Sequence, residues 1–435
     1  MERMMMGELI AWKNNKKRKP LILKGARQVG KTFLLKSFGK ENYLKVHYLN
    51  FENEKKLATI FERDLNPQRI LDELSFHLNT SINKQKDLII FDEIQDCPRA
   101  LTSLKYFSEE MPELSLASAG SLLGIHFNGT SFPVGKVDFL TLYPMCFLEF
   151  LQAIGEQRSI EQIHQAKEPL SEIIHEHIWE RLKWYFITGG LPEVVKTFRD
   201  LQSDLFEAFQ ASRKVQEALI LAYNSDMAKH AGKVNAMHLD RLWKATPYQL
   251  ARDADKSIPR FSFKDAVPGI NRYSKLANVI DWLEAAGLIL KVKITTEGSL
   301  PFSAHAAENA FKLLLFDVGI LGALSELSPD VLMKQSYGSY KGYFAENFVA
   351  QEFLVAGFSS LYSWKEKQAK VDYLMEEKGL PIPIEVKAGK TAKAKSASLF
   401  QKKYNSPYKV ILSGQNLLLT ETIKRFPLYM TSRVI

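Results

Sequence analysis

Short apolar runs alternate with helical patterns along the first third of the chain. Segments 33–38, 71–78 and 99–110 carry apolar residues at helical spacing, and Pro98 marks the start of the last of them. The apolar runs between these segments have the lengths of strands. The expected strands are 21–24, 43–49, 88–91, 114–119 and 137–142. Strands that alternate with helices in this way predict an α/β fold with a parallel, doubly wound sheet.

A helical pattern with one interruption fills the middle of the chain. It runs from 147 to 224 and is broken at 189–192, where Gly-Gly-Leu-Pro favours a plain connection between two helices. Further on, a short helix precedes a longer one that Ser274 is expected to cap and Gly287 to end. A strand over 288–294 follows. Helix, turn, helix and strand in this order predict a winged-helix module.

The last part of the chain returns to mixed helix and strand. A helix is expected over 342–356, and the segments 370–375 and 383–387 are expected to pair as a hairpin. Four domains are therefore predicted. Their expected boundaries are 1–150 for the parallel-sheet domain, 151–230 for a helical segment, 231–300 for the winged-helix module and 301–435 for a second α/β domain.

The composition is that of a globular protein with a sizeable core. The chain has 435 residues, of which 46% are hydrophobic and 25% charged, and its net charge of +9 permits a polyanionic partner without requiring one. No apolar run reaches the ~18 residues of a membrane-spanning helix, and no secretory signal follows the basic cluster 16–19. Cys97 and Cys146 are too isolated for a disulfide framework or a zinc site. A cytoplasmic protein without a membrane partner is expected.

The most informative motif lies between the first strand and the first long helix. It fits G-x-x-x-x-G-K-[ST], which forms a phosphate-binding loop when a strand precedes it and a helix follows. Backbone N–H groups of such a loop surround phosphate oxygens, while Lys31 reaches the β- and γ-phosphates and Thr32 holds Mg²⁺. The expected nucleotide-binding residues are Gly25, Ala26, Arg27, Gln28, Val29, Gly30, Lys31 and Thr32. The alternative is an accidental match, which occurs in roughly one or two of every hundred chains of this length.

An acidic pair after another buried strand complements this loop. Asp92 and Glu93 are expected at the carboxyl end of a parallel strand beside it. There Asp92 can bind Mg²⁺ and Glu93 can polarise an attacking water, which predicts nucleotide hydrolysis. The alternative is that both acids only cap the next helix. Ser118 or Ser121, at the end of a further strand, can contact the γ-phosphate or instead cap the helix that follows.

A second charged group occupies the hairpin expected near the C-terminus. Asp372 and Glu385 stand on its two strands and can converge on one divalent cation, with Glu346 as a further ligand. Lys387 can stabilise the charge that develops on a phosphate or orient a water. Because Glu-x-Lys is a common tripeptide, the alternative is an edge hairpin whose charges are only solvated.

Together these motifs resemble a known family. They are similar to the bacterial and archaeal AAA-type ATPases related to the STAND group, which carry a C-terminal domain of unknown function similar to PD-(D/E)XK nucleases. The matching segments are 25–32, 91–95, 119–121, 143–144, 147–151, 346–349, 371–373 and 383–387. The likeness covers nearly the whole chain, and it is most specific in the ATPase half.

The resemblance implies that the first domain binds ATP, that residues 151–230 form a helical lid, and that the last domain is restriction-endonuclease-like. One departure concerns the arginine finger. Where relatives often have a Gly-Arg pair before the Tyr-Pro segment, this chain has Gly135 and Lys136. Arg99 and Arg181 are the other candidates for that role.

Three functions compete at this point. The first is an ATP-hydrolysing switch coupled to a nuclease-like domain that contacts DNA, with Arg272, Lys275 and the lysines of 288–294 facing phosphates. The second is a regulatory or scaffold protein whose last domain only binds nucleic acid or protein. A small-molecule kinase is third, because P-loop kinases are usually shorter. No Asn-Lys-x-Asp motif is present, which favours ATP over GTP. A homo-oligomer is compatible with each of the three.

Overall fold

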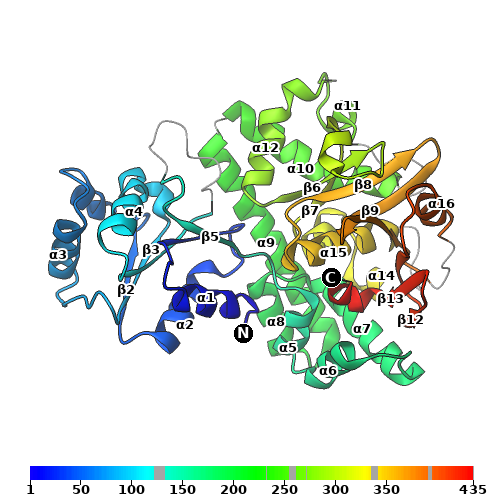
Figure 1. The fold of residues 1–435 in the computed structure, drawn as a ribbon, viewed down its shortest axis with the longest axis horizontal. Coiled ribbons are helices and arrows are strands. Elements are labelled where there is room, and N and C mark those ends of the chain that lie inside the picture. The colour runs from blue at the N-terminus through cyan, green and yellow to red at the C-terminus, as the bar shows by residue number, and fades with distance from the viewer. Residues whose placement is uncertain are drawn as a thin grey trace. The chain divides into compact units, whose positions relative to one another are not determined.

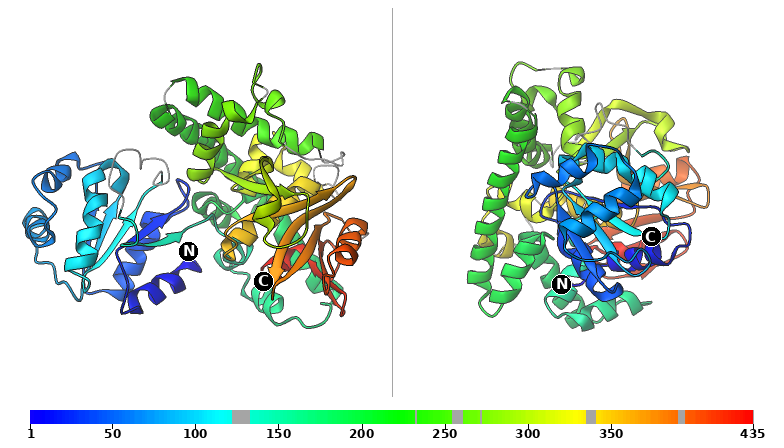
Figure 2. Two further views of the ribbon diagram at one scale, coloured as in Figure 1. Left: turned by 45° about the horizontal axis from the view of Figure 1, so that its top comes forward. Right: turned by 90° about the vertical axis from the view of Figure 1, so that its left-hand side faces the viewer.

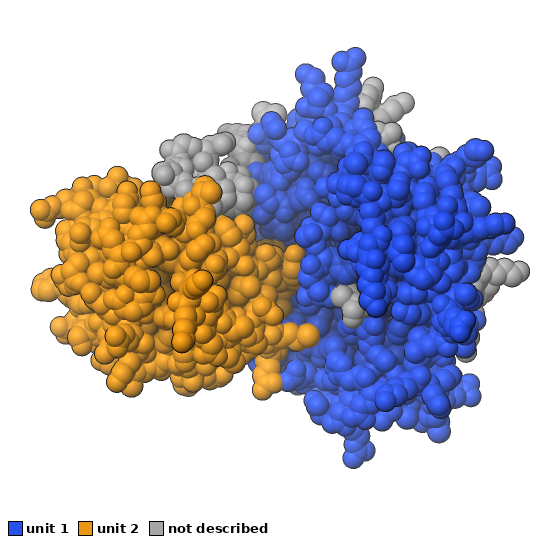
Figure 3. Space-filling view, viewed as in Figure 1, with its two compact units in different colours: residues 1, 144–435 blue, residues 2–143 orange. Residues whose placement is uncertain are grey.

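The chain folds into two compact units in the computed structural model. One unit comprises residues 2–143, and the other comprises residues 144–435 together with Met1 (Figure 3). The described residues are 1–121, 133–231, 233–253, 261–270, 272–334, 341–389 and 394–434. In this part of the chain no helix combines the length and the apolar character needed to span a bilayer.

A five-stranded parallel sheet forms the centre of the first unit, which confirms the predicted α/β architecture (Figure 1). Its strand order is β2-β3-β4-β1-β5. The strands are β1 (Leu21–Lys24), β2 (Val46–Asn50), β3 (Leu88–Asp92), β4 (Ser115–Ala119) and β5 (Asp138–Thr141). The helices are α1 (Met5–Asn14), α2 (Lys31–Asn42), α3 (Pro67–His77) and α4 (Pro98–Glu110), with a 3-10 helix η1 at Lys55–Phe61.

Helices cover both faces of this sheet, which explains why its strands are continuous apolar runs. Ile89 and Phe91 of β3 belong to a core shared with α3, α4 and η1. The opposite side of the same strand faces α2, where Gly39 lies so close that a Cβ there would come within 3.0 Å of Leu88. Alternate side chains of β3 therefore enter two different helix–sheet interfaces.

The second unit begins with a series of helices. They are α5 (Phe147–Ala153), α6 (Gln157–Gln165), α7 (Glu172–Thr188), α8 (Pro192–Leu201), α9 (Leu205–Ala231) and α10 (Lys233–Asp253). The predicted break between α7 and α8 is present. It does more than connect two helices, because a Cβ on Gly189 would lie 2.2 Å from Asp317 Oδ1 and one on Gly190 would lie 2.0 Å from the Met145 carbonyl oxygen. Both glycines are needed for close packing.

An eight-stranded mixed sheet follows, in the order β12-β13-β11-β10-β9-β8-β6-β7. Its strands are β6 (Ile289–Thr295), β7 (Ala306–Leu315), β8 (Leu361–Glu366), β9 (Ala369–Glu377), β10 (Leu380–Val386), β11 (Lys409–Ser413), β12 (Leu418–Leu419) and β13 (Ile423–Pro427). The accompanying helices are α11 (Phe263–Ala266), α12 (Ala277–Ala285), α13 (Val318–Leu324), α14 (Pro329–Lys334), α15 (Lys341–Val355) and α16 (Lys395–Lys403). In Figures 1 and 2 the orange strands β8 and β9 run beside the yellow-green β6 and β7.

The strand expected in the winged-helix outline belongs to this larger sheet. β6 pairs antiparallel with β7 and, on its other edge, parallel with β8. Ser274 does not cap the longer helix, because it lies in a 3-10 turn and Leu276 is the residue before α12. The sheet therefore runs across the boundary expected at residue 300.

The predicted hairpin of Asp372 and Glu385 is present as the antiparallel pair β9 and β10. Helices cover its two faces. Phe353 of α15 packs on Tyr373 of β9 with ring centroids 5.5 Å apart, while the next residue, Leu374, joins a core with Phe400 of α16. The hairpin is thus an interior part of the sheet and not an exposed edge ribbon.

Candidate functional site

The loop between β1 and α2 has the backbone conformation that its glycines predict. Gly25 has φ 147°, and a Cβ at that position would lie 2.1 Å from the carbonyl oxygen of Leu142 after β5. Gly30 has φ 94° and is the residue before the first turn of α2. Both positions favour glycine, the first by close approach and the second by its left-handed backbone. Gln28 also has a positive φ, 66°, which is unusual for a residue with a Cβ.

Lys31 folds back into this loop. Its Nζ donates hydrogen bonds to the carbonyl oxygens of Gly25, at 2.9 Å, and Ala26, at 2.8 Å. Burial lowers the pKa of Lys31 to about 8, although the nearby charges of Glu93 and Asp92 act in the other direction. The loop therefore encloses a buried amine at its centre, in position to exchange the two carbonyls for other oxygens.

Arg3, just before α1, connects the phosphate loop to the segment that follows β5. Its guanidinium donates to the carbonyl oxygens of Val29, at 2.9 Å, and Tyr143, at 2.6 Å. The sequence offered no signal for this contact, because Arg3 lies far from the loop motif in the chain and precedes a helix with no motif of its own. It makes the N-terminal segment part of the support of the phosphate loop.

Thr32 and Asp92 meet at the carboxyl edge of the sheet. The Thr32 hydroxyl donates to Asp92 Oδ2 over 2.8 Å, and Asp92 is only 3% exposed. The Tyr48 hydroxyl donates to the same oxygen over 2.7 Å and accepts from Asn50 Nδ2 at 3.1 Å. Burial and Asp92 raise the pKa of Tyr48 to about 12, since the Asn50 hydrogen bond offsets them only in part.

Sequence reasoning missed Tyr48 and Asn50. A usable signal was present, because both lie at the end of a strand that was predicted, and parallel strands bring their carboxyl ends to one edge. The register pairs Asn50 with Asp92. What the sequence did not reveal is the strand order, which makes β2 the direct neighbour of β3.

Glu93 follows Asp92 in a left-handed conformation, with φ 49°. Gln95 Nε2 donates to its Oε2 over 2.6 Å. Burial raises the pKa of Glu93. β3 is not adjacent to the strand that precedes the phosphate loop, because β4 lies between β1 and β3. Thr32 nevertheless reaches Asp92 across β4, from the start of α2.

The two serines at the end of β4 have different positions. Ser118 is buried, and its hydroxyl donates to the carbonyl oxygen of Leu21 over 2.9 Å. That bond joins β4 to β1 and gives Ser118 a structural role. Ser121 is partly exposed at the limit of the described residues, and the helix expected to begin at 122 lies outside them.

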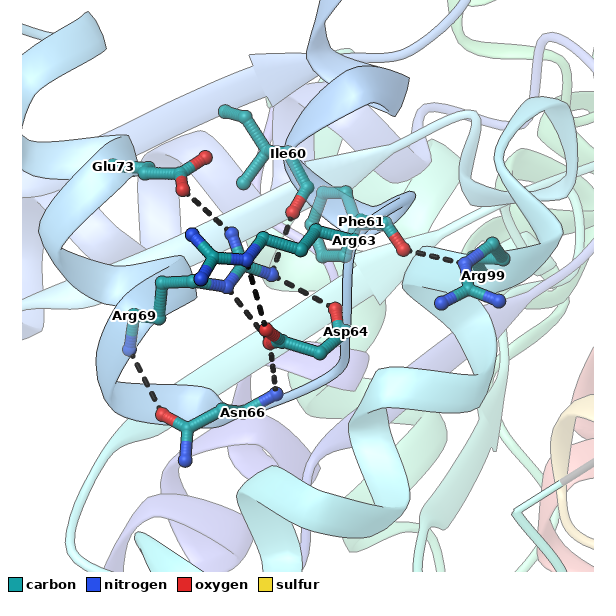
Figure 4. Close-up of polar contacts among 8 residues, drawn as sticks. All are labelled: Ile60, Phe61, Arg63, Asp64, Asn66, Arg69, Glu73 and Arg99. Carbon is teal, nitrogen blue, oxygen red and sulfur yellow. Dashed lines mark hydrogen bonds and ion pairs between the residues drawn. The ribbon is translucent and has the colours of Figure 1, made fainter.

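Arg99 is held at the start of α4 by a backbone contact. Its Nε donates to the carbonyl oxygen of Phe61, as Figure 4 shows. The loop after Phe61 is in turn fixed by Arg69, which bonds Asp64 Oδ1 at 2.7 Å, Glu73 Oε1 at 2.7 Å and the carbonyl oxygens of Ile60 and Asp64 (Figure 4). Arg99 is exposed to solvent, while its Nε remains hydrogen-bonded to the backbone.

Arg181 and Lys136 both have acidic partners nearby. Arg181 Nε lies 2.5 Å from Glu156 Oε1, and its guanidinium stacks 3.9 Å from the Trp184 ring centroid. Lys136 Nζ lies 3.0 Å from Glu109 Oε1 at the surface. The structure thus gives each of these cations a local structural contact.

The charged residues predicted near the C-terminus converge, but with lysines between them. Lys370 Nζ lies 3.0 Å from Asp372 Oδ1 and 3.3 Å from Glu346 Oε1. Lys312 Nζ lies 2.8 Å from Glu346 Oε2. Lys312 and the contact of Lys370 with Glu346 were not predicted, because only the fold brings β7, β9 and α15 together.

Glu385 has a separate partner. Its Oε1 lies 2.6 Å from Lys387 Nζ, and burial, followed by the charge of Asp372, raises the pKa of Glu385 to about 7. Among the described residues, no group of three or more His, Cys, Asp or Glu side chains is arranged to hold a metal ion.

The lysines expected to face DNA phosphates are partly engaged elsewhere. Lys291 of β6 lies 3.1 Å from Glu284 Oε2 and 3.7 Å from Asp281 Oδ1, and only 11% of its side chain is exposed. Arg272 and Lys275 are exposed. The exposed pair keeps the hypothesis of phosphate contact open, whereas Lys291 already has acidic partners.

The parallel sheet, its glycine loop and the contact of Thr32 with Asp92 define a P-loop nucleotide-binding domain. A match to a family model described as an AAA domain, over residues 17–151, supports an AAA-type ATPase domain. Residues 180–331 and 341–431 match two models described as domains of unknown function, DUF8612 and DUF4143. No curated protein matches the chain.

Solved structures with remote similarity include ATPases. The Walker-type ATPase PABY2304 of Pyrococcus abyssi is 16% identical with a TM-score of 0.45, over 73% of this chain and 94% of that one. A RuvB variant of Thermotoga maritima is 14% identical with a TM-score of 0.33, over 66% and 87%. AMPPCP-bound DnaA of Aquifex aeolicus is 15% identical with a TM-score of 0.29, over 64% and 86%. At these scores, the assignment rests on the site and the AAA match.

Proposed function

We propose that the unit of residues 2–143 binds and hydrolyses ATP and acts as a nucleotide-dependent switch. The observation that carries this proposal is the 2.8 Å contact between the Thr32 hydroxyl and Asp92 Oδ2, directly beside a glycine loop that encloses Lys31. A loop that only turned between a strand and a helix would not need a buried lysine and a buried aspartate at its mouth.

The residues have distinct roles in this proposal. The backbone N–H groups of 25–30 and the N-terminal end of α2 bind the phosphates of ATP. Lys31 leaves the carbonyls of Gly25 and Ala26 and pairs with the phosphate oxygens. Glu93 orients the attacking water and accepts its proton, for which a raised pKa is suited.

Thr32 and Asp92 fit a magnesium ion, because a hydroxyl and a carboxylate oxygen already meet there and Mg²⁺ prefers oxygen ligands. When bound, Mg²⁺ neutralises charge on the phosphates. Tyr48 holds Asp92 Oδ2 from the other side, so the carboxylate keeps its orientation when Thr32 turns toward a ligand.

The output of the switch has two candidates. In the first, residues 151–230 act as a helical lid, residues 231–300 as a winged-helix-like module and residues 301–435 as a nuclease-like domain that contacts DNA. In the second, the last domain only binds nucleic acid or protein. The contacts of Lys370 with Glu346 and Asp372 favour the second, since they occupy the carboxylates that a nuclease metal would need. Assembly into a homo-oligomer, with Arg99 reaching a neighbouring site, is part of the first proposal.

ATP hydrolysis by the wild type, Lys31→Ala and Glu93→Gln, with and without duplex DNA, tests the first step. We expect Lys31→Ala to lose ATP binding, and Glu93→Gln to keep binding while turnover falls about a hundredfold or more. Tight ATP binding with no turnover in the wild type under any condition would refute hydrolysis and leave a nucleotide-stabilised binding protein.

A cleavage assay separates the two outputs. Duplex and single-stranded DNA are incubated with wild type and Asp372→Ala in Mg²⁺, in Mn²⁺ and in chelator with ATP withheld. Metal-dependent cleavage that Asp372→Ala abolishes supports the nuclease-like output. DNA retention without cleavage, unchanged by chelator, supports a binding output.

A further inference from the structure

We propose that the ammonium group of Lys370 takes the place of a metal ion in the carboxylate cluster formed by Glu346, Asp372 and Glu385. In a PD-(D/E)XK nuclease, which this domain resembles in sequence, a divalent metal ion would bind at such a cluster. The residues do not fit a metal as they are arranged. The inference goes beyond the nucleotide switch and does not depend on ATP turnover.

The position of Lys370 follows from the strand that carries it. Lys370 and Asp372 are two residues apart on β9, so their side chains share one face of the sheet. Glu346 of α15 reaches the same face, since its Oε1 lies close to Lys370 Nζ. A register shift of β9 against β8 between Val371 and Leu374 interrupts the strict alternation, so Tyr373 also contacts α15. Lys370 Nζ thus has a carboxylate on its own strand at 3.0 Å and one on the helix above at 3.3 Å. One ammonium bridges two acids, as a metal ion would.

The cluster is electrically balanced by its own side chains. Three carboxylates, Glu346, Asp372 and Glu385, face three ammonium groups, those of Lys312, Lys370 and Lys387. A divalent cation binds strongly where carboxylates carry excess negative charge. Here a second cation would also meet the ammonium that already lies between Glu346 and Asp372, and Coulomb repulsion grows in a buried setting.

Most of the carboxylate oxygens already have partners. Both oxygens of Glu346 contact lysines, Oδ1 of Asp372 contacts Lys370, and Oδ2 of Asp372 accepts from the Val386 N–H at 2.9 Å. Oε1 of Glu385 contacts Lys387. Within the described residues, Oε2 of Glu385 is the cluster's buried oxygen without a hydrogen bond. A single oxygen is too few to hold Mg²⁺ or Mn²⁺.

Lys312 reinforces this arrangement from β7. Only 2% of its side chain is exposed, and its ammonium is paired with Glu346. A buried ammonium is costly without a carboxylate partner, so Glu346 cannot turn toward a metal without leaving Lys312 unpaired. The fold therefore commits Glu346 to the two lysines.

Mn²⁺ binding to the nucleotide-free full chain tests the proposal, with free Mn²⁺ followed by electron paramagnetic resonance. We expect Asp372→Asn to leave the Mn²⁺ binding of the wild type unchanged. We expect Lys370→Gln to gain one Mn²⁺ site at this cluster, with an affinity about tenfold or more above that of the wild type there. Adding Asp372→Asn to Lys370→Gln should remove the gained site. Lys365→Gln, on the neighbouring strand β8, is the matched control and should gain nothing.

Two results would overturn the proposal. The first is a Mn²⁺ site in the wild type that Asp372→Asn removes, and this comparison needs no Lys370 variant. The second is a folded Lys370→Gln, shown by an unchanged circular dichroism spectrum, that gains no site. Because neither readout involves ATP, failure here is distinguishable from failure of the hydrolase proposal.

Discussion

The hydroxyl of Thr32 donates to Oδ2 of Asp92 over 2.8 Å, although 60 positions separate the two residues in the chain. The contact joins the first turn of the helix after the phosphate loop to the end of β3. It forms although β4 lies between β1 and β3, because α2 begins at this edge of the sheet. Tyr48 shares the same oxygen, so two strands and one helix meet at a single carboxylate.

In the proposed ATPase, replacing Tyr48 by Phe should slow ATP turnover about tenfold, because a group that orients a carboxylate proposed to hold a metal ion usually contributes about 10- to 100-fold. The aromatic ring and its contact with Lys36 remain, so the fold should be unaffected. We expect the dependence of turnover on Mg²⁺ concentration to move to higher concentration, while ATP affinity measured without Mg²⁺ stays the same. Steady-state kinetics over a Mg²⁺ series provides the measurement.

Tyr106→Phe is the control, since the described residues give the Tyr106 hydroxyl no hydrogen bond. It should behave as the wild type. Equal turnover and equal Mg²⁺ dependence in Tyr48→Phe would show that Tyr48 does not position Asp92.

The sequence predicted this site unevenly, for a physical reason. Loop residues 25–32 and the pair Asp92-Glu93 form local sequence motifs, and their chemical roles can be predicted without knowledge of the fold. Tyr48, Asn50 and Arg3 reach the site only through strand order and helix placement, which depend on contacts distant in the sequence. The contact of Lys370 with Glu346 was missed for the same reason, whereas its contact with Asp372 lies within one strand and follows from their spacing of two residues.

Glu352 should make the stability of the second unit depend on pH. It lies on α15, is buried, and accepts a hydrogen bond from the Phe147 N–H at 2.9 Å, at the start of α5. Burial raises the pKa of Glu352 to about 8, and Glu149 nearby adds to the rise. The folded protein therefore binds a proton that the unfolded chain releases above about pH 4.5, and the free energy of unfolding falls as pH rises from there toward 8.

Glu352→Gln should remove this contribution. At about pH 8 the variant should be more stable than the wild type by roughly 2 kcal/mol, because the ionisation cost disappears while the new amide N–H needs an acceptor of its own. At about pH 4.5 it should gain nothing. Chemical denaturation at both pH values measures the difference, with exposed Glu161→Gln as control. A variant no more stable at the higher pH would contradict the assignment.

Gly190→Ala should destabilise the second unit by about 3 kcal/mol or prevent its folding, because the new Cβ would lie 2.0 Å from the carbonyl oxygen of Met145. The Met145 N–H also donates a 2.7 Å hydrogen bond to the Gly190 carbonyl oxygen, which holds the two backbones together. Backbone cannot move aside as a flexible side chain does. Gly342→Ala, where nothing lies within 4 Å, should change stability by less than about 1 kcal/mol. Similar melting curves for the two variants would show that the close approach is not structural.

Arg69→Leu should lower the melting temperature of the first unit by about 5 °C, because the Ile60 and Asp64 carbonyls and two carboxylates lose their donor (Figure 4). Arg63→Leu is the control, since 81% of its side chain is exposed and its Asp64 contact is 3.8 Å long. It should shift the midpoint by less than about 1 °C. A calorimetric scan of both variants decides between a structural and an incidental Arg69 network.

The sequence predicted individual strands and a local hairpin better than it predicted which distant strands pair. The parallel sheet and the β9–β10 hairpin follow from apolar runs of strand length. The pairing of β6 with β8 could not be seen, because the two strands are separated by β7 and three α-helices, and hydrophobic pattern alone does not choose between possible strand partners.

The place of β6 also limits where this part of the chain can be divided. A gene fragment that ends near residue 300 encodes β6 without β7 or β8, and so leaves both edges of that strand without hydrogen-bond partners. A fragment that begins there lacks the strand between β7 and β8. A cut at residue 300 therefore separates β6 from both of its partner strands, and the eight-stranded sheet is whole only in a chain that carries β6 to β13 together.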